Sequence, residues 1–310
     1  MLRVGTQSDY WYDNNDPDGS VAFIKSCGFD TIDFNLHNLI KINDMVKAGP
    51  PYTSFFDASA EELCEHFRGF KEACQRYDVT VAQVHGPFPT WLNGEDEMNE
   101  YIIGVYEKCF AISAFIGAPG IVVHPVHGAG DKEWEANTWQ YRRLIPFAKK
   151  YGVKIVLENI FGRYNDRFIQ GRMSNPEDAI KYFDTLTEEA GFDAFGFCFD
   201  VGHALITCQN IPRFIRMLGH RLTNLHIHDN NGLDDLHIVP YTCLTKGQNT
   251  VCDWSGFISA LKEIGYKGDL CFETFRTYKV LPRELWADMY RFNAAIGHYF
   301  AKIILDDGEK

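Results

Sequence analysis

The chain alternates between short apolar runs of strand length and longer segments with helical periodicity. The predicted strands are Leu2–Thr6, Thr31–Leu36, Val79–His85, Ile121–His124, Lys154–Glu158, Gly196–Asp200, Leu222–His228 and Asp269–Glu273. The predicted helices end near Gly28, Tyr77 and Phe115, or cover Trp134–Tyr151, Pro176–Ala190, Ile211–Leu218, Trp254–Ile264 and Pro282–Ile304. Start signals such as the capping pair Ser59 and Glu62 support the helices.

This order predicts a (β/α)8 TIM barrel, because eight strands alternating with eight helices need about the length of this chain, 310 residues. The competing architecture, an open doubly wound sheet, predicts a glycine-rich phosphate turn after the first strand. Gly5-Thr6-Gln7 is not followed by such a turn. No linker, low-complexity tract or repeat divides the sequence, so we expect residues 1–310 to form a single domain.

Composition and charge narrow the classes of partner. Hydrophobic residues make up 45% and charged residues 23% of the chain, as in a soluble globular protein. No apolar run is long enough to span a bilayer, and the N-terminal residues lack the apolar segment of a signal peptide. We therefore expect a cytoplasmic protein without a membrane partner. The nine cysteines include no C-x-x-C pair, which favours reduced thiols. A formal net charge of −12 repels polyanions, so nucleic acid is not expected as a partner.

Ionisable side chains recur at the ends of the predicted strands. From the third strand to the eighth, these side chains are His85, His124, Glu158, Asp200 with His203, His226 with His228, and Glu273. In such barrels the reactive groups lie at the carboxyl ends of the strands. One polar residue at a strand end is usually explained by local hydrogen bonding. Local hydrogen bonding does not explain why ionisable residues recur at the same position on six strands. This recurrence predicts a functional site at the carboxyl ends of the strands.

Glu158 and Glu273 each follow apolar residues directly, so both carboxylates project from buried strand ends. An unpaired ionised carboxylate there is energetically costly or shifts its pKa. A buried salt-bridge network is one alternative, but lysines and arginines are lacking at the strand ends. We therefore expect one divalent cation, shared by Glu158, Asp200, His226 and Glu273. Mostly oxygen donors favour Mn²⁺, with Mg²⁺, Co²⁺ or Zn²⁺ as alternatives.

Several motifs of the C-terminal half resemble one known group of proteins. They are L-E-N (157–159), F-D-V-G-H (199–203), H-I-H-D-N (226–230), D-D-L-H (234–237), Asp253-Trp254, G-Y-K-G (265–268) and F-E-T-F (272–275). On these motifs the chain is similar to the xylose-isomerase-like TIM-barrel superfamily, the sugar phosphate isomerase/epimerase group that also contains apurinic endonucleases. The N-terminal half matches in strand rhythm and in His85 and His124. The motifs are specific for the superfamily and weak for the substrate.

The resemblance implies a metal-dependent sugar isomerase or epimerase that transfers a proton through a metal-stabilised enediolate. In relatives with these motifs, one divalent metal is bound by the residues matching Glu158, Asp200, His226 and Glu273. The two glutamates also act as acid and base there, and the residue matching His203 contacts a substrate oxygen. Loss of a leaving group from the same enediolate gives a lyase, of the dehydratase or C-glycoside-cleaving type, as an alternative outcome.

The loop after the seventh strand departs from the ketose 3-epimerases of the group. Those epimerases carry an arginine shortly after the strand-seven histidine, where this chain reads D-N-N-G. Asp235 and His237 instead form a D-x-H pair that belongs to a further metal site in the endonucleases. With His85, His124 and His203, the chain keeps counterparts of much of a three-metal site. An endonuclease-like nuclease is therefore an alternative function, although the acidic charge opposes DNA binding.

Aromatic residues surround the expected site. Tyr10 and Trp11 follow the first strand, and Phe88 and Trp91 follow the third. Aromatic faces pack on sugar rings or planar aglycones, although a lid or an oligomer contact needs the same surface. At the end of the fourth strand, His124 is expected to add a catalytic base or a hydroxyl contact. The residues expected to contact the substrate are His85, Asp235, His237, Trp11, Phe88 and Trp91.

The expected partner is a small sugar or sugar derivative. A homo-oligomer is the usual arrangement in the family, and a C-glycoside lyase would have a small partner subunit as well. A non-catalytic sugar-binding barrel is the remaining alternative, and the intact set of expected metal ligands argues against it.

Overall fold

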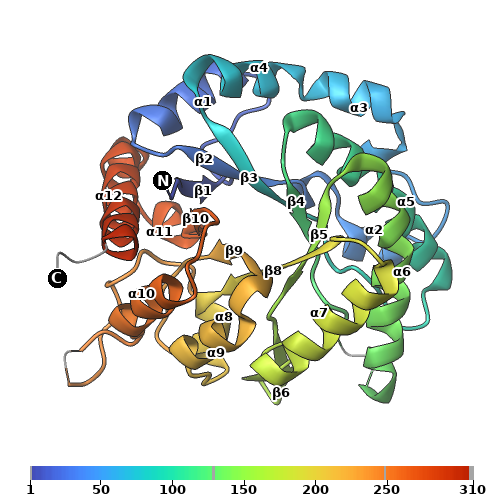
Figure 1. Cartoon of the computed structure of the whole chain (residues 1–310). Helices are drawn as coiled ribbons and strands as arrows, with labels where there is room; N and C mark the ends of the chain where they lie inside the picture. The colour runs from blue at the N-terminus through green and yellow to red at the C-terminus, as the bar shows by residue number, and fades with distance from the viewer. Residues whose placement is uncertain (1, 128–129, 248, 307–310) are drawn as a thin grey trace.

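The computed structural model describes residues 2–127, 130–247 and 249–306. Eight parallel strands form a barrel surrounded by helices (Figure 1), which confirms the predicted (β/α)8 TIM-barrel fold. The barrel strands are β1 (Val4–Gln7), β2 (Thr31–Asn35), β3 (Thr80–His85), β4 (Gly120–Val122), β5 (Lys154–Glu158), β8 (Phe195–Asp200), β9 (Leu222–His226) and β10 (Leu270–Phe272). Each of them overlaps one of the predicted strands.

The barrel closes between β9 and β10. Ile227 pairs with Phe272 in a parallel bridge just beyond β9. The Ile227 amide donates to the Cys271 carbonyl at 2.8 Å, and the Glu273 amide donates to the Ile227 carbonyl at 3.1 Å. Because β10 also pairs with β1, the eight strands form a ring in which β1 and β2 stand opposite β5 and β8.

Helices cover the outside of the barrel (Figure 1). They are α1 (Pro17–Ser26), α3 (Ala60–His66), α4 (Arg68–Tyr77), α5 (Asp96–Ile116), α6 (Glu133–Tyr151), α7 (Pro176–Ala190), α9 (Ile211–Leu218), α10 (Trp254–Glu263) and α12 (Trp286–Leu305), with the shorter α2 (Ile42–Ala48), α8 (Val201–Ile206) and α11 (Phe275–Lys279). Ser59 and Glu62 form the predicted capping box of α3. The helix predicted from there to Tyr77 is two helices, because Phe67, with φ −94° and ψ 7°, leaves the helical path.

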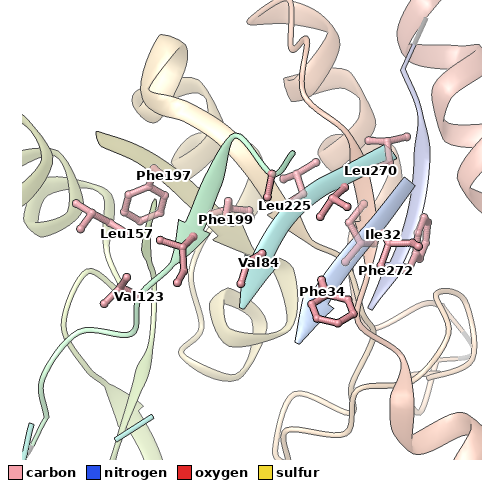
Figure 2. Close-up of a cluster of buried hydrophobic side chains, with 14 of the residues drawn as sticks. Ile32, Phe34, Val84, Val123, Leu157, Phe197, Phe199, Leu225, Leu270 and Phe272 are labelled. Atoms are coloured by element: carbon pink, nitrogen blue, oxygen red, sulfur yellow. The ribbon is translucent and has the colours of Figure 1, made fainter. Parts of the chain in front are cut away.

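Successive residues of each strand point to opposite faces of the barrel wall. One set is apolar and belongs to the main core, part of which Figure 2 shows: Ile32, Phe34, Val84, Val123, Leu157, Phe197, Phe199, Leu225, Leu270 and Phe272. Ring contacts join this set to the helices. The Phe34 ring centroid lies 4.4 Å from that of Phe70 in α4, and the Phe199 centroid lies 5.0 Å from that of Phe214 in α9. The alternate set faces the barrel interior and includes buried polar residues, such as Gln83 and Asp200, as well as the apolar Val122 and Val156.

A hairpin of β6 (Phe161–Tyr164) and β7 (Arg167–Gln170) follows β5 and was not predicted. Its turn residues Asn165 and Asp166 both have positive φ, 46° and 59°, as a tight hairpin turn requires. The strands are largely exposed, so they lack the strong alternation of buried and exposed positions that identifies a strand in a sequence. The hairpin forms a separate two-stranded sheet that begins three residues after the end of β5.

No helix among the described residues is long and apolar enough to cross a membrane. All nine cysteines carry free thiols, in agreement with the predicted absence of disulfides. The predicted single domain, 1–310, includes residues 1 and 307–310, which lie outside the described residues, and the one-domain assignment stays a prediction.

Candidate active site

The ends of four strands bring the predicted metal ligands together. Glu158 and Asp200 are the last residues of β5 and β8, His226 ends β9, and Glu273 follows β10. His226 Nδ1 lies 2.8 Å from Glu158 Oε1, 3.5 Å from Glu273 Oε2 and 3.8 Å from Asp200 Oδ2. The side chains of Glu158, Asp200 and His226 are fully buried, whereas that of Glu273 is 13% exposed to solvent. We call these four residues the quartet.

The L-E-N and F-D-V-G-H motifs hold two of these elements in place. Asn159 Nδ2 donates to the Asp200 carbonyl at 2.8 Å, and Asn159 Oδ1 accepts the Asp200 amide at 2.8 Å, which ties the ends of β5 and β8 together. Asp200 also caps α8, because its Oδ1 accepts the His203 amide at 2.6 Å. The first turn of α8 therefore returns His203 to the site. There the Asn159 carbonyl fixes His203 Nδ1 at 3.0 Å and leaves Nε2 available.

Asp33 of β2, which was not predicted as a site residue, positions the His226 ring through its Nε2 atom. Its Oδ2 lies 3.0 Å from His226 Nε2, and it also accepts Gln83 Nε2 at 2.8 Å. Gln83 Oε1 in turn accepts Asn224 Nδ2 at 2.6 Å. Polar side chains of β2, β3 and β9, buried except for the half-buried Asn224, thus form a layer inside the barrel. This layer fixes the imidazole so that Nδ1 faces the three carboxylates of the quartet.

A second cluster, of His203, His228, Asp235 and His237, adjoins the quartet, and its ligand atoms lie within 4.8 Å of one another. His237 Nε2 is 2.9 Å from Asp235 Oδ2. Asp235 Oδ1 is buried without a hydrogen-bond partner, 3.9 Å from His203 Nε2 and 4.0 Å from His228 Nε2. Gly202 makes room for this cluster, because a Cβ atom there would overlap the His228 ring.

His85 and His124 stand on the other side of Glu158. Their Nε2 atoms are 3.1 Å apart, and His124 Nε2 lies 3.0 Å from Glu158 Oε2. The Gly86 carbonyl fixes His85 Nδ1 at 3.0 Å. Burial, together with the neighbouring His124, lowers the pKa of His85 to about 4. His85 is therefore a neutral imidazole near pH 7, the form that binds a metal or accepts a hydroxyl proton.

The two glutamates have opposite electrostatic environments. Burial alone would raise the pKa of Glu158, but His226 and His124 outweigh it and hold that pKa well below its ordinary value. Burial also raises the pKa of Glu273, and the nearby charges of Asp200 and Glu158 add to this effect. Without a bound cation, Glu158 therefore holds its proton more weakly, and Glu273 more strongly, than a free glutamate does.

The donor set fits a divalent cation. The 3.5 and 3.8 Å separations in the quartet are long for hydrogen bonds. They are close to the roughly 3–3.5 Å expected between two ligands of one ion bound at about 2.1 Å. In the adjoining cluster, Asp235 Oδ1 is buried and has no hydrogen-bond partner, as expected of an atom that binds a metal ion. Within the described residues, the ion pairs of the quartet carboxylates involve histidines and no lysine or arginine, so an ordinary salt-bridge network does not neutralise them.

A cavity of about 610 Å³ opens over the clusters, and Phe88 lines it together with His85, His124, Glu158, His203, Asp235, His237 and Glu273. Trp91, also predicted to contact the substrate, lines a neighbouring cavity of about 230 Å³. The prediction for Trp11 does not fit the structure, because Trp11 is buried and its Nε1 donates to the Gln7 carbonyl at 2.6 Å. The adjacent Tyr10, with a positive φ of 69°, lines the main cavity instead.

Part of the cavity wall was not predicted from the sequence, namely Asp9, His37, Asn38, Phe275 and Arg276. Arg276 is the one lysine or arginine among the described residues that line this cavity. Burial, with His85 and His124, lowers the pKa of His37 to about 3 and keeps it neutral. These residues follow the ends of β1, β2 and β10, the same topological position that identified the quartet. That position was their only signal, except for Phe275, which ends the F-E-T-F motif.

Comparison with known proteins places the chain in one family. The model of the family described as xylose isomerase-like TIM barrel matches residues 21–293, and the chain belongs to this family. The family resemblance inferred from the motifs is thereby confirmed. An uncharacterised protein of Methanocaldococcus jannaschii, MJ1311, is 31% identical over 217 residues, which cover 65% of this chain and 67% of that protein.

Two solved structures illustrate the range of similar folds. The apo form of YcjR, a 3-keto-D-glucoside 4-epimerase from E. coli, aligns over 96% of this chain and 100% of its own, with a TM-score of 0.69 and 18% sequence identity. The IOLI protein with a bound zinc atom aligns over 100% of both chains, with a TM-score of 0.58 and 18% identity. At such identities the similarity establishes the shared barrel fold.

Proposed function

We propose that the protein is a divalent-metal-dependent sugar isomerase or epimerase that transfers a proton through an enediolate. The observation that carries this proposal is the convergence of Glu158 and Glu273 with Asp200 and His226 at the base of the cavity. Similar structures bear the names of sugar epimerases, among them a 3-keto-D-glucoside 4-epimerase and a D-psicose 3-epimerase, which supports the same class of substrate.

The quartet would hold the cation, with three carboxylates and one imidazole as donors. Such a set favours Mn²⁺, with Mg²⁺, Co²⁺ or Zn²⁺ as alternatives. When bound, the ion would polarise the substrate carbonyl and offset the negative charge of the enediolate.

The side chains that line the cavity then move the proton. One of Glu158 and Glu273 would remove the proton from the carbon next to the carbonyl, and the other would return it. The two carboxyl groups come from strands on different sides of the barrel, so they can serve opposite faces of a bound sugar. His203, fixed through Nδ1 by the Asn159 carbonyl, presents Nε2 to a substrate oxygen. His124, beside Glu158, would act as an auxiliary base or hydroxyl contact.

Deuterium exchange tests this proposal. The metal-loaded protein is incubated with keto-sugars in D2O with Mn²⁺, and NMR identifies the carbon that gains deuterium. We expect exchange next to the carbonyl, and its loss in Glu158→Gln and in Glu273→Gln. Glu263→Gln, which changes an exposed carboxylate paired with Arg216, is the matched control. Absence of exchange with every keto-sugar, or exchange unaffected by both cavity variants, would contradict the proposal.

Product analysis of the same reactions separates the outcomes of a shared enediolate. A proton returned to the neighbouring carbon gives an isomer, and one returned to the opposite face gives an epimer. An eliminated group identifies a lyase of the dehydratase or C-glycoside-cleaving type. We further propose a cytoplasmic homo-oligomer acting on a small sugar, with a small partner subunit in the C-glycoside case.

The flanking clusters favour a second candidate, a metal-dependent phosphoester hydrolase of the apurinic-endonuclease type. His85 and His124 on one side, and His203, Asp235 and His237 on the other, offer ligands for cations beyond the first. The net charge of −12 opposes DNA binding and keeps this candidate second. Metal analysis with an abasic-site cleavage assay distinguishes the two: three bound ions and cleavage support the hydrolase, and one ion without cleavage supports the isomerase.

A further inference from the structure

The cavity extends well beyond the residues proposed to do the chemistry. Its volume of about 610 Å³ is in the range of pockets that enclose ligands of several rings. The wall formed by the loops after β1 and β2 stands across the ring from β5 and β8, four strands away in either direction. A group bound at this wall lies across the cavity from Glu158 and Asp200, on the side of β10 and Glu273. Because the cavity exceeds the volume of one sugar ring, such a group would belong to a part of the ligand beyond the reacting ring.

Asp9, in the loop after β1, is the charged group of this wall. Its Oδ1 accepts Asn38 Nδ2 at 2.6 Å, and its Oδ2 accepts Asn35 Nδ2 at 3.3 Å. Each carboxylate oxygen keeps a further acceptor position, and Asp9 lines the cavity. Within the described part of the chain, its hydrogen-bond partners are these neutral amides, and no lysine or arginine pairs with it.

A partly buried carboxylate without a cation is costly for the fold. Burial, followed by the charge of Asp33, raises the pKa of Asp9 to about 6, in line with that cost. Neighbouring hydroxyl groups of a sugar are the donors that match this arrangement. Each hydroxyl can donate to one carboxylate oxygen, and it can also accept from an amide such as that of Asn38.

The residue next to Asp9 supplies an apolar surface. Tyr10 is 43% exposed, and its ring lies nearly parallel to that of Phe275, with centroids 6.5 Å apart. The Trp286 ring packs edge-on against the Tyr10 ring, with centroids 6.2 Å apart. A fixed aromatic face beside a carboxylate and an amide suits the apolar face and the hydroxyls of one sugar ring. Behind this wall, a side cavity of about 130 Å³, also lined by Asp9, Tyr10 and Asn38, leaves room for a substituent of that ring.

We infer that Asp9, Asn38 and Tyr10 form a second carbohydrate subsite, which binds a non-reacting sugar ring through neighbouring hydroxyls. The substrate of the proposed enzyme is accordingly a glycoside of disaccharide size and not a free monosaccharide. This assignment of substrate class rests on the proposed function, whereas the binding of a second ring does not depend on turnover.

Calorimetric titration of the Mn²⁺-loaded protein tests the inference. The probes are cellobiose, maltose, lactose and sucrose, with glucose as the one-ring reference and phenyl β-glucoside as a second ring without hydroxyls. We expect at least one disaccharide to bind ten-fold or more tightly than glucose. Asp9→Asn should reduce the affinity for that disaccharide roughly 10- to 100-fold, the value of hydrogen bonds to a charged group, and so abolish a ten-fold preference. Asn38→Ala should reduce the same affinity by roughly 3- to 10-fold, as expected for a neutral hydrogen bond.

Asp44→Asn, on the exposed surface of α2 beyond Asn38, is the matched control and should leave the preference unchanged. Bound Mn²⁺, measured for each variant, verifies that the barrel is intact. Three results would overturn the inference: no disaccharide preferred over glucose, a preference insensitive to Asp9→Asn, or phenyl β-glucoside bound as tightly as the best disaccharide. Deuterium exchange is independent of this titration. A preference without exchange would reject only the proposed function, and exchange without a preference would reject only the subsite.

Discussion

Replacing Asp9 by asparagine should change how the stability of the fold depends on pH. Burial, with a smaller contribution from Asp33, raises the pKa of the Asp9 carboxyl from 3.8 to about 6. An acid whose pKa is raised in the folded state contributes stability that is fully present below the unfolded pKa and is lost as the pH rises through the folded pKa. The unmodified protein should therefore lose, between about pH 4 and pH 6.5, a stability contribution that Asp9→Asn does not lose.

The size of the effect follows from the shift. About two pKa units correspond to about 3 kcal/mol. About 1 kcal/mol of this is already lost by pH 4.5, and solvent screening of the partly exposed Asp9 reduces the rest, so we expect a relative loss of about 1.5 kcal/mol between pH 4.5 and 7.5. The substitution also disturbs the hydrogen bonds from Asn35 and Asn38, which adds an offset of about 1 kcal/mol. That offset does not vary with pH, so the comparison across pH isolates the titration of Asp9.

Urea unfolding of both proteins at pH 4.5, 6 and 7.5 measures this difference. EDTA is included because a bound cation would itself lower the pKa of Asp9. Asp44→Asn serves as the control, since its exposed carboxylate should not produce the same trend. A difference in unfolding free energy that stays constant to within about 0.5 kcal/mol across the three pH values would refute the reasoning. The carboxyl would then be hydrated in the folded protein, and the argument from its desolvation would fail.

Four further predictions concern the quartet. Glu158→Gln should lower the rate of deuterium exchange by roughly 10²- to 10⁴-fold in NMR assays while the circular dichroism spectrum is retained, and an unchanged rate would exclude Glu158 as an acid or base. Asp33→Asn should weaken Mn²⁺ binding by roughly 10- to 100-fold in a chelator competition, because His226 loses the group that orients it; equal affinity would leave Asp33 a purely structural residue. Removal of the metal by EDTA should lower the melting temperature, and Mn²⁺ at about 100 times its Kd should restore about 2.7 kcal/mol; a melting temperature indifferent to EDTA would contradict this. Mn²⁺ affinity should rise with pH, because the raised pKa of Glu273 makes the cation compete with a proton, and Glu273→Gln should flatten that dependence in calorimetric titrations.

The sequence predicts best where a side chain occupies a position that the fold itself defines. Glu158, Asp200, His226 and Glu273 end parallel strands of one barrel, and the ring of strands brings such ends together. Their convergence follows from strand order and the two-residue period, without knowledge of any loop. The strands were predicted for the same reason, because their buried apolar positions dominate the pattern.

Residues outside those positions were harder to predict. Asp33 lies inside β2, where an inward polar residue looks the same in sequence as one that faces solvent on an exposed strand. In the loop after β1, the left-handed backbone of Tyr10 turns its ring into the cavity and leaves Trp11 in the core. No periodicity extends through such a loop, so the sequence could not separate two adjacent aromatic residues. The break at Phe67 was missed because apolar spacing continues across it.

The short seam between β9 and β10 gives the quartet a mechanical role as well as a chemical one. The seam consists of the Ile227 bridge and its two backbone hydrogen bonds, and His226 and Glu273 flank that bridge on either side. A cation bound by both residues would cross-link β9 and β10, which are joined here by one bridge and two backbone hydrogen bonds. Loss of the cation would allow these two hydrogen bonds to open more often. The amides of Ile227 and Glu273 would then exchange their hydrogens faster, so their exchange rates would report whether the metal is bound.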